Sequence, residues 1–206
     1  MNFGPPDRAY DKLELVPSDY FHHLTLAELP GGGEVPLEID LGCGDGSFLV
    51  DMATHHPECQ FLGVERLLGR VRKVARKAER AGLSNLRVLR LESAYTIGWI
   101  LPEACASRVH LLFPDPWPKK RHHKNRFVQP GNIASIKRIL RDGGEFLFKT
   151  DHEGYFEWVK DAMHDTKLLD PLEWEAADFF YPETDFERQW KDEGRSIYRA
   201  RFGKNP

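Results

Sequence analysis

A short proline-rich segment carries the residues most suited to chemistry. It reads Phe-Pro-Asp-Pro-Trp-Pro over residues 113–118, and a basic run follows it over residues 119–124. Proline fixes its own φ and restricts the residue before it, so Asp115 is held in a largely preset backbone conformation. The apolar run at 109–113 predicts a buried strand directly before it. Because open α/β sheets bind ligands at the carboxyl ends of strands, this rigid acid beside a cationic tail indicates a pocket that orients a base while the tail holds phosphate.

A glycine-rich loop at residues 42–46 is the second candidate site. Glycines at alternate positions let the backbone turn tightly and approach a ligand closely, but Gly-x-Gly-x-Gly alone is weak evidence. Two acids strengthen it, because Asp40 precedes the loop and Glu65 lies about twenty residues on, where Rossmann-type folds place the ribose-binding carboxylate. A dinucleotide site is the alternative. Acids at Asp40 and Asp45 would repel a pyrophosphate, however, and suit a ligand with sulfonium and ammonium groups.

The glycine loop resembles motif I of class I methyltransferases, which use S-adenosylmethionine (SAM), and residues 113–124 resemble the signature of the bacterial tRNA (guanine-N7-)-methyltransferases. A proline-rich solvated turn would explain the prolines, but not the acid, the aromatic residue and the basic block together. The family usually has Glu where this chain has Asp40, and Asp or Asn where it has Ser93. The resemblance implies that SAM is bound by Asp40, Gly42, Gly44, Gly46, Glu65, Ser93 and Asp115.

Further matches extend the resemblance over residues 37–202 and imply a substrate side. By resemblance, Lys119 and Asp151 contact the substrate guanine or its nucleotide. The block Thr184-Asp185-Phe186-Glu187 matches the family's C-terminal motif, which implies that Thr184, Asp185, Phe186 and Glu187 bind substrate. By itself this block is unspecific, because Thr with Glu three residues later also forms a helix capping box. Both interpretations can hold together.

The resemblance implies methylation of guanine N7 in the variable loop of tRNA, with Asp115 as the catalytic residue. N7 is an acceptor lone pair without a proton, so its methylation needs alignment rather than a general base. We hypothesise that Asp115 accepts hydrogen bonds from guanine N1 and N2 and offsets the positive charge that develops on the ring. No metal is predicted, because the spacing of the histidines matches no zinc motif. They are His22, His23, His110, His122 and His123.

Strands and helices alternate along the chain, which predicts a parallel, doubly wound sheet. Strands are expected at residues 35–41, 60–65, 86–91, 108–113, 145–149 and 196–202, and helices at 47–55, 67–81, 94–101, 133–140 and 155–164. The fold class is therefore α/β, with one mostly parallel, Rossmann-like sheet and an antiparallel C-terminal strand. Residues 1–34 are expected to form a partly disordered N-terminal extension, and residues 35–206 the methyltransferase domain.

Composition limits the class of protein and the kind of partner. The 206 residues are 41% hydrophobic and 30% charged, as in ordinary soluble globular proteins, and no apolar run could span a membrane. Three widely spaced cysteines indicate reduced thiols in a cytoplasmic protein. The net charge is −3, yet residues 66–90 hold nine Lys or Arg and one acid. This cluster and the one at 119–126 suit tRNA phosphates, although solvated helix faces are the alternative.

Two rival functions stay open at this stage. One is a methyltransferase of the same fold that acts on another RNA, a protein or a small molecule. The other is a tRNA-binding relative that has lost catalytic turnover, an alternative suggested by the departures from the family at Asp40 and Ser93. The oligomeric state, monomer or homodimer, is also open, since no heptad or apolar stripe marks an interface.

Overall fold

A computed structural model describes residues 12–174 and 179–205, so the first eleven residues of the expected N-terminal extension lie outside the described range. Seven strands form one sheet in the order β3-β2-β1-β4-β5-β7-β6. Strands β1 to β5 pair in parallel, whereas β7 is antiparallel to both β5 and β6. The predicted mostly parallel sheet with an antiparallel C-terminal strand is therefore confirmed. The strands are β1 (Leu37–Leu41), β2 (Gln60–Val64), β3 (Leu86–Leu89), β4 (Ala106–Leu112), β5 (Leu140–Thr150), β6 (Asp170–Leu172) and β7 (Tyr198–Gly203).

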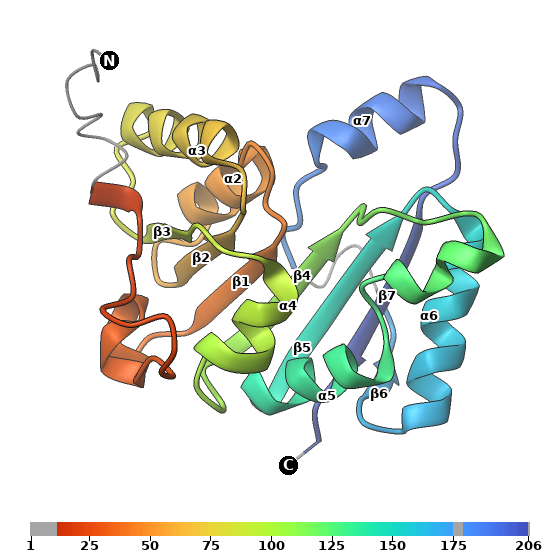
Figure 1. Cartoon of the computed structure of the whole chain (residues 1–206). Coiled ribbons are helices and arrows are strands. Elements are labelled where there is room, and N and C mark those ends of the chain that lie inside the picture. Colours follow the sequence, from red (N-terminus) through yellow and green to blue (C-terminus); the bar gives the residue numbers. More distant parts are fainter. Residues whose placement is uncertain (1–11, 175–178, 206) are drawn as a thin grey trace, which may run out of the picture.

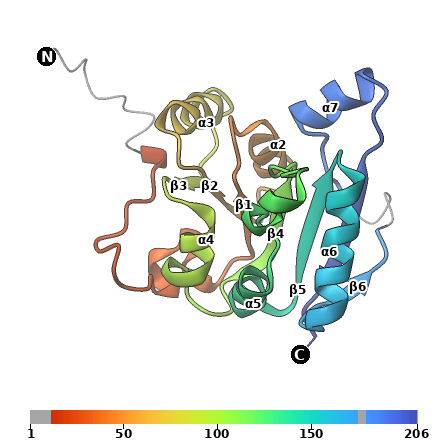
Figure 2. The same cartoon turned by 45° about the vertical axis from the view of Figure 1, so that its right-hand side comes forward.

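Helices cover both faces of the sheet (Figures 1 and 2). On one face, α2 and α3 pack against β2 and β3 through a core that includes Phe48, Met52 and Val74. On the other face, α4, α5 and α6 enclose a larger core around Ile39, Val109 and Phe148. The helices are α2 (Ser47–His55), α3 (Leu68–Arg80), α4 (Ser93–Tyr95), α5 (Pro130–Ile139), α6 (Glu153–Thr166) and α7 (Asp185–Asp192).

Helix α3 illustrates why these residues form these elements. Its buried positions are Val71, Val74, Ala75 and Ala78, a spacing of three and four that places one apolar stripe against the sheet. The remaining face is strongly basic and points to solvent. Gly82 follows the helix with φ 65°, a left-handed conformation that ends it at little cost.

Most predicted elements lie where periodicity placed them, and the differences have local causes. The predicted helix at 94–101 is α4 followed by η3 (Thr96–Ile100), a π-helix. Strand β5 begins at Leu140 rather than at the predicted residue 145, because Leu140 pairs with Ala106 of β4 and an irregular stretch separates this pair from Arg108 and Glu145. Strand β6 and helix α7 were not predicted as elements, since the first has three residues and the second is largely polar.

The segment before β1 packs on the domain. Leu13, Leu24 and Leu29 are buried, and the backbone N–H of Leu15 donates to the carbonyl of Val88 in β3 at 2.9 Å. Short 3₁₀-helices η1 (Leu26–Glu28) and η2 (Pro30–Gly33) lead into β1. Over the described range of the chain, no helix is long and apolar enough to cross a membrane.

Candidate active site

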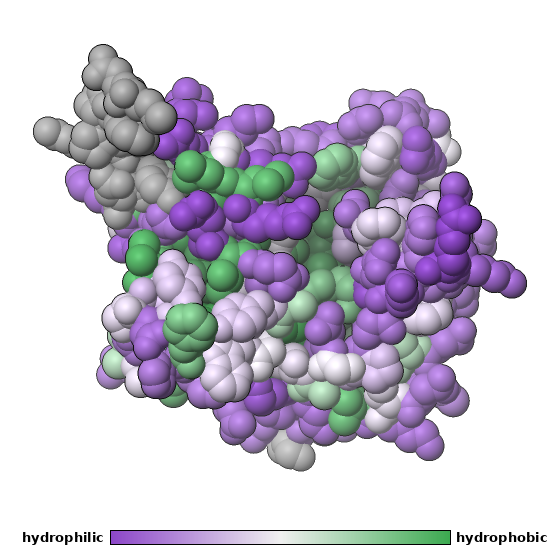
Figure 3. All heavy atoms as spheres, in the orientation of Figure 1, coloured by the Kyte–Doolittle hydropathy of each residue, from purple (hydrophilic) through white to green (hydrophobic). Residues whose placement is uncertain are grey.

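A cavity of about 500 Å³ lies at the carboxyl ends of β1 to β4. Figure 3 shows a hollow in this face of the molecule, with an apolar floor and hydrophilic side chains gathered along its rim. Four residues predicted to bind the cofactor line the cavity: Gly42, Glu65, Ser93 and Asp115. Its walls also include Leu41, Arg66, Leu67, Arg70, Leu91, Glu92, Leu111, Pro114, Trp117, Asn125 and Phe127.

The glycine loop is built from left-handed backbone. Gly42, Gly44 and Gly46 have φ values of 77°, 60° and 79°, where side chains other than glycine are disfavoured. The N–H of Gly42 donates to the carbonyl of Val64 at 2.8 Å, which ties the loop to the end of β2. Only Gly42 faces the cavity directly. Gly46 instead permits close helix packing, since a Cβ there would lie 2.7 Å from Val74 of α3.

Asp40 and Glu65 place two carboxylates beside this loop. Asp40 is 3% exposed and accepts no hydrogen bond from any described residue. Burial and the neighbouring Glu65 raise the pKa of Asp40 to about 7. Glu65 is held more firmly, because its Oε1 accepts from the N–H of Leu67 at 2.8 Å and Arg70 lies 3.5 Å from its Oε2. Asp40 does not line the cavity wall itself but lies buried behind the loop.

Ser93 begins α4 and is half-buried at the cavity wall. Glu92, directly before it, accepts hydrogen bonds from the N–H groups of Ala94 and Tyr95 at 2.9 and 2.7 Å. Glu92 thereby caps the helix and fixes the turn that carries Ser93. The pairing of a capping acid with a short hydroxyl leaves this wall of the cavity polar.

Asp115 lies in a constrained loop after β4. Phe113 and Trp117, on either side of the Pro114-Asp115-Pro116 core, have φ values of 51° and 44°, which are uncommon for bulky residues. The guanidinium of Arg126 donates to the carbonyl of Pro116 at 2.9 Å and to that of Gly154 at 3.1 Å. Asp115 itself is exposed at the cavity mouth and is free of hydrogen bonds from the described residues. Its backbone is fixed while its carboxylate remains available.

The C-terminal block reaches the same end of the sheet. In Figures 1 and 2, α7 stands above the end toward which β4 and β5 point. Thr184 caps α7 by accepting from the N–H of Glu187 at 2.9 Å, so the predicted capping box is present in its hydroxyl half. The rings of Phe186 and Phe113 lie 6.5 Å apart, which brings α7 beside the strand that leads to Asp115.

The remaining predicted substrate residues are positioned differently from one another. Asp185 is bonded to Ser47 of α2 and to Arg188, so its carboxylate is already occupied. Asp151 follows β5 and pairs with Arg195 at 3.0 Å. Lys119 is exposed at the start of η4 (Lys120–Asn125) and lies outside the cavity wall, as do Asp151 and residues 184–187.

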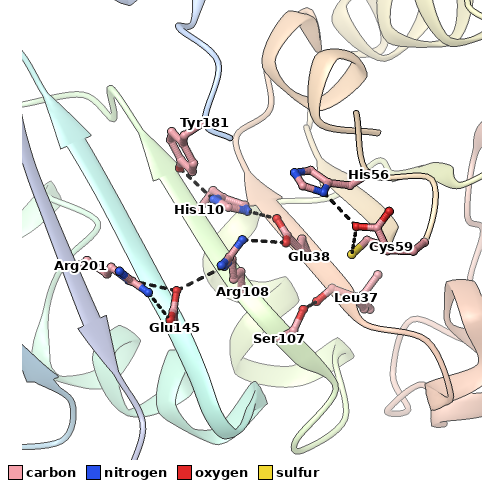
Figure 4. A network of polar contacts seen from close by, with 11 residues as sticks. Leu37, Glu38, His56, Cys59, Ser107, Arg108, His110, Glu145, Tyr181 and Arg201 are labelled. Carbon is pink, nitrogen blue, oxygen red and sulfur yellow. Dashed lines mark hydrogen bonds and ion pairs between the residues drawn. The ribbon is translucent and has the colours of Figure 1, made fainter. Parts of the chain in front are cut away.

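The sheet face that carries Asp40 also carries charged and polar side chains from β4 and β5. His110 connects Glu38, 2.9 Å from its Nε2, with the hydroxyl of Tyr181, 2.9 Å from its Nδ1. Burial raises the pKa of Tyr181 well above its ordinary value. The contacts fasten residues 179–181 across the sheet, directly before Thr184. Figure 4 shows the network, which includes Glu38, Arg108, His110, Glu145, Tyr181 and Arg201.

The five histidines do not gather in space. His110 is fixed within the sheet, and His23 lies against Trp99 at ring centroids 4.7 Å apart. His122 and His123 contact Trp117 and Trp158 respectively. Within residues 12–174 and 179–205, no group of three or more His, Cys, Asp or Glu could hold a metal ion.

Sequence reasoning assigned no role to several residues that the structure brings to the site. Trp117 was part of the proline-rich signature, and Glu92 stood beside the predicted Ser93; both line the cavity. Lys149 lay within the strand that leads to Asp151, and its side chain is buried against Glu187 at 2.7 Å. A lysine in an apolar strand was the available signal, because charged side chains are rarely buried without a partner.

The residues present fit SAM. The carboxylate of Asp40 is buried and accepts no hydrogen bond from the described residues, and Glu65 directly follows β2. These two carboxylates can therefore accept hydrogen bonds from cationic or hydroxyl groups of a ligand. Gly42 lets the backbone approach a ligand at the cavity wall. Leu67, Leu91 and Phe127 supply the apolar surface that a flat base requires.

Comparisons with solved structures support the fold. An antibiotic-related methyltransferase superposes with a TM-score of 0.63, covering 92% of this chain and 97% of its own at 18% identity. The 16S rRNA methyltransferase KamB gives a TM-score of 0.62 over 83% of this chain and 88% of its own at 16% identity. At these identities the likeness concerns the fold alone, which is that of class I SAM methyltransferases.

Comparisons of sequence are more specific. The family model described as "Putative methyltransferase" matches residues 34–200. The tRNA (guanine-N(7)-)-methyltransferase of Staphylococcus saprophyticus is 36% identical, over 97% of this chain and 96% of the relative. That of Rhodopseudomonas palustris is 35% identical, over 97% and 79% respectively. With the geometry above, these matches show that the chain belongs to the tRNA (guanine-N7-)-methyltransferase family of SAM-dependent methyltransferases.

Proposed function

We propose that this chain transfers the methyl group of SAM to N7 of a guanine in the variable loop of tRNA, in the cytoplasm and without a metal. The observation that carries the proposal is the placement of Asp115. Its loop is locked by three prolines and by Arg126, yet its carboxylate is free at the mouth of the cavity that also contains Gly42, Glu65 and Ser93. Family membership supports the same reaction.

SAM would be held by the acids and glycines around the cavity. Glu65 and Ser93, in the cavity wall, would offer acceptors to the ribose hydroxyl groups and the base, and Asp40, buried behind the glycine loop, would attract the ammonium by its charge. Gly42 allows its backbone N–H to come close. When bound, SAM supplies an electrophilic methyl group on a positively charged sulfur. The apolar side chains of the wall exclude water from that region.

Asp115 orients the guanine and balances charge. A carboxylate only accepts hydrogen bonds, so it suits the N1 and N2 donors of guanine and leaves N7 facing the cavity. As N7 becomes methylated the ring gains positive charge, which a fixed carboxylate stabilises. Asp151 and Glu187 are secondary acceptors for the same base, each held by a cation, Arg195 and Lys149.

Basic side chains on two sides of the cavity suit the tRNA phosphates. Helix α3 presents Arg72, Lys73 and Arg76 to solvent, and none of the three is paired with a described acid. Across the cavity, Lys119 is exposed at the start of η4. An acid-lined pocket between cationic walls can select a guanine while holding the backbone around it.

The test is methyl transfer from labelled SAM to unmethylated tRNA, with the product nucleoside identified by mass spectrometry. We expect 7-methylguanosine from the wild type and a loss of at least about 100-fold in kcat for Asp115→Asn, with SAM affinity largely retained. The neutral amide keeps size and shape but can no longer act as a charged, acceptor-only group. Asp165→Asn, at a side chain 81% exposed in α6, is the matched control.

Each outcome bears on a different part of the proposal. Another methylated nucleoside would leave the fold and cofactor intact and refute the guanine pocket. SAM binding without any methylated tRNA would favour a different substrate, and no SAM binding would favour a relative without turnover. A folded Asp115→Asn protein with normal turnover would refute the role of Asp115.

A further inference from the structure

Lys149 is a buried cation near the carboxyl end of β5. The residue is only 4% exposed, and its neighbours Phe148 and Thr150 are fully buried. Its Nζ lies 4.8 Å from the ring centroid of Tyr181 and 5.7 Å from that of Trp174. Burial lowers the pKa of Lys149, and the hydrogen bond to Glu187 opposes this effect. A charge in such surroundings needs a partner.

That partner is Glu187, which is itself 5% exposed. Lys149 Nζ donates to Glu187 Oε2 at 2.7 Å, a short charge-assisted hydrogen bond between residues 38 positions apart. The backbone of Glu187 is fixed as well, because its N–H donates to Thr184. Only Oε1 remains, and it has a weaker contact, with Lys191 at 3.5 Å. The carboxylate is thus held firmly at Oε2 by Lys149 and more weakly at Oε1 by Lys191.

Lys149 also supports the loop that carries Asp115. Its carbonyl accepts from the N–H of Phe113 at 2.8 Å, at the point where β4 leads into Pro114. Lys149 therefore supports two acids of the proposed guanine pocket. Its backbone carbonyl supports the loop of Asp115, and its ammonium holds Glu187. The contact between the rings of Phe113 and Phe186 reinforces this connection.

Few other charges compete for Glu187. Lys191 is 47% exposed and mainly bonded to Glu183. Tyr181 is protonated at neutral pH, since burial raises its pKa well above the ordinary value. Arg199 of β7 acts on Lys149 only at longer range. The charged or titratable groups facing the pair are Tyr181, Glu183, Lys191 and Arg199, with Asp40 and Glu38 beyond the tyrosine ring.

We propose that Lys149 is a positioning residue for methyl transfer, which neutralises the buried charge of Glu187 by holding Oε2 and aims the weakly held Oε1 at the N–H groups of the substrate guanine. The inference rests on the proposed function. A carboxylate accepts from N1 and N2 of guanine, whereas a protonated carboxyl presents its own hydrogen and loses one acceptor. Without Lys149, the buried charge of Glu187 would lose its nearest counter-ion, so the charged, acceptor-only form would be less stable than in the wild type.

Three variants separate this role from simple packing. Lys149→Met keeps the length and the apolar stem but removes the charge. Lys191→Met removes the exposed cation from the other oxygen of the same carboxylate and is the matched control. Lys149→Met/Glu187→Gln removes both charges and leaves no carboxyl to titrate. For each, kcat and KM for tRNA are measured from pH 6 to 9, with SAM affinity by calorimetry and folding by thermal denaturation.

We expect Lys149→Met to move the acid limb of the kcat/KM profile up by about three pH units, so that its deficit is largest at pH 6, on the order of tenfold, and largely disappears by pH 9. SAM affinity should stay within about threefold of the wild type, because Glu187 lies outside the cofactor cavity. Lys191→Met should keep the wild-type acid limb. The double variant, which has no carboxyl at position 187, should show no shifted limb.

A folded Lys149→Met protein with a deficit equal at every pH would reduce Lys149 to a packing role and overturn the inference. Normal activity would overturn it as well. If Lys149→Met does not fold, Lys149→Gln, which keeps an N–H donor without the charge, gives the same pH comparison. A wild type that forms no 7-methylguanosine would refute the proposed function, and the inference with it, before any variant is compared.

Discussion

At the scale of the residue, Asp40 gives the clearest pH dependence. Its pKa of about 7 lies far above the ordinary 3.8, because burial and Glu65 disfavour the charged form. Since the ammonium of SAM requires the carboxylate, we predict that SAM affinity weakens as pH falls below 7, by up to about tenfold per pH unit. Calorimetric titrations of SAM between pH 5.5 and 8.5 measure this directly.

The raised pKa of Asp40 also makes the stability of the SAM-free protein depend on pH. Between pH 3.8 and about 7 the unfolded carboxyl is ionised while the native one keeps its proton, so the free energy of unfolding decreases as pH rises through this window. Asp40→Asn should remove both pH effects, whereas Asp51→Asn, at an exposed acid of α2, should keep them. An equal pH dependence of SAM affinity in Asp40→Asn would show that another group is responsible.

At the scale of the element, the glycine loop links β1, α2 and α3. Gly46→Ala would place a Cβ 2.7 Å from Val74 and keep an unfavourable φ of 79°. We predict a loss of about 2–4 kcal/mol in the free energy of unfolding, from backbone strain together with overpacking. Chemical denaturation measures it. Gly82→Ala is the control, since its φ is 65° with nothing within 4 Å, and should cost only the strain of about 1–2 kcal/mol.

Equal losses in these two glycine variants would contradict the packing role given to Gly46. A larger loss in Gly46→Ala would show that the loop is shaped by the approach of α3 as much as by the ligand. The distinction matters because only Gly42 of the three loop glycines lines the cavity. The motif combines one position for the ligand with one for the fold.

At the scale of the whole molecule, charge is separated into regions despite a net charge of only −3. We predict that changing Arg72, Lys73 and Arg76 of α3 to Gln weakens tRNA binding and reduces the magnitude of the slope of log K against log salt by about 2–3. Each phosphate contact that is lost means fewer counterions released on binding. Filter binding at several salt concentrations measures the slope.

Lys160 and Lys167 are the matched control for α3. Both are exposed; Lys160 lies within α6 and Lys167 directly follows it. Helix α6 runs back from the carboxyl end of β5 (Figure 1). Changing them to Gln should leave the salt slope and SAM affinity as in the wild type. A slope that changes equally in both sets would mean that tRNA binding depends on total charge rather than on the face that α3 presents.

Much of this fold follows from local pattern. Alternating apolar runs predicted the parallel strands, and the helix over residues 47–55 coincides with α2. The start of β5 was placed wrongly, since Leu140 joins the strand only by pairing with Ala106, a distant residue of β4. Helix α7 has a predicted cap but almost no apolar face, so its existence depends on the contacts that Glu187 and Phe186 make with distant strands.

By itself, the sequence determined the local chemistry of this protein: the prolines that fix Asp115, the glycine loop, and the acids Asp40 and Glu65 at the ends of strands. These properties depend on backbone preference and periodicity within a few residues. Only the tertiary structure decided that Lys149 pairs with Glu187, that Asp185 is occupied by Ser47, and that Gly46 serves helix packing. Such pairings depend on strand order and on how the chain returns across the sheet, and burial then determines which charges must find a partner.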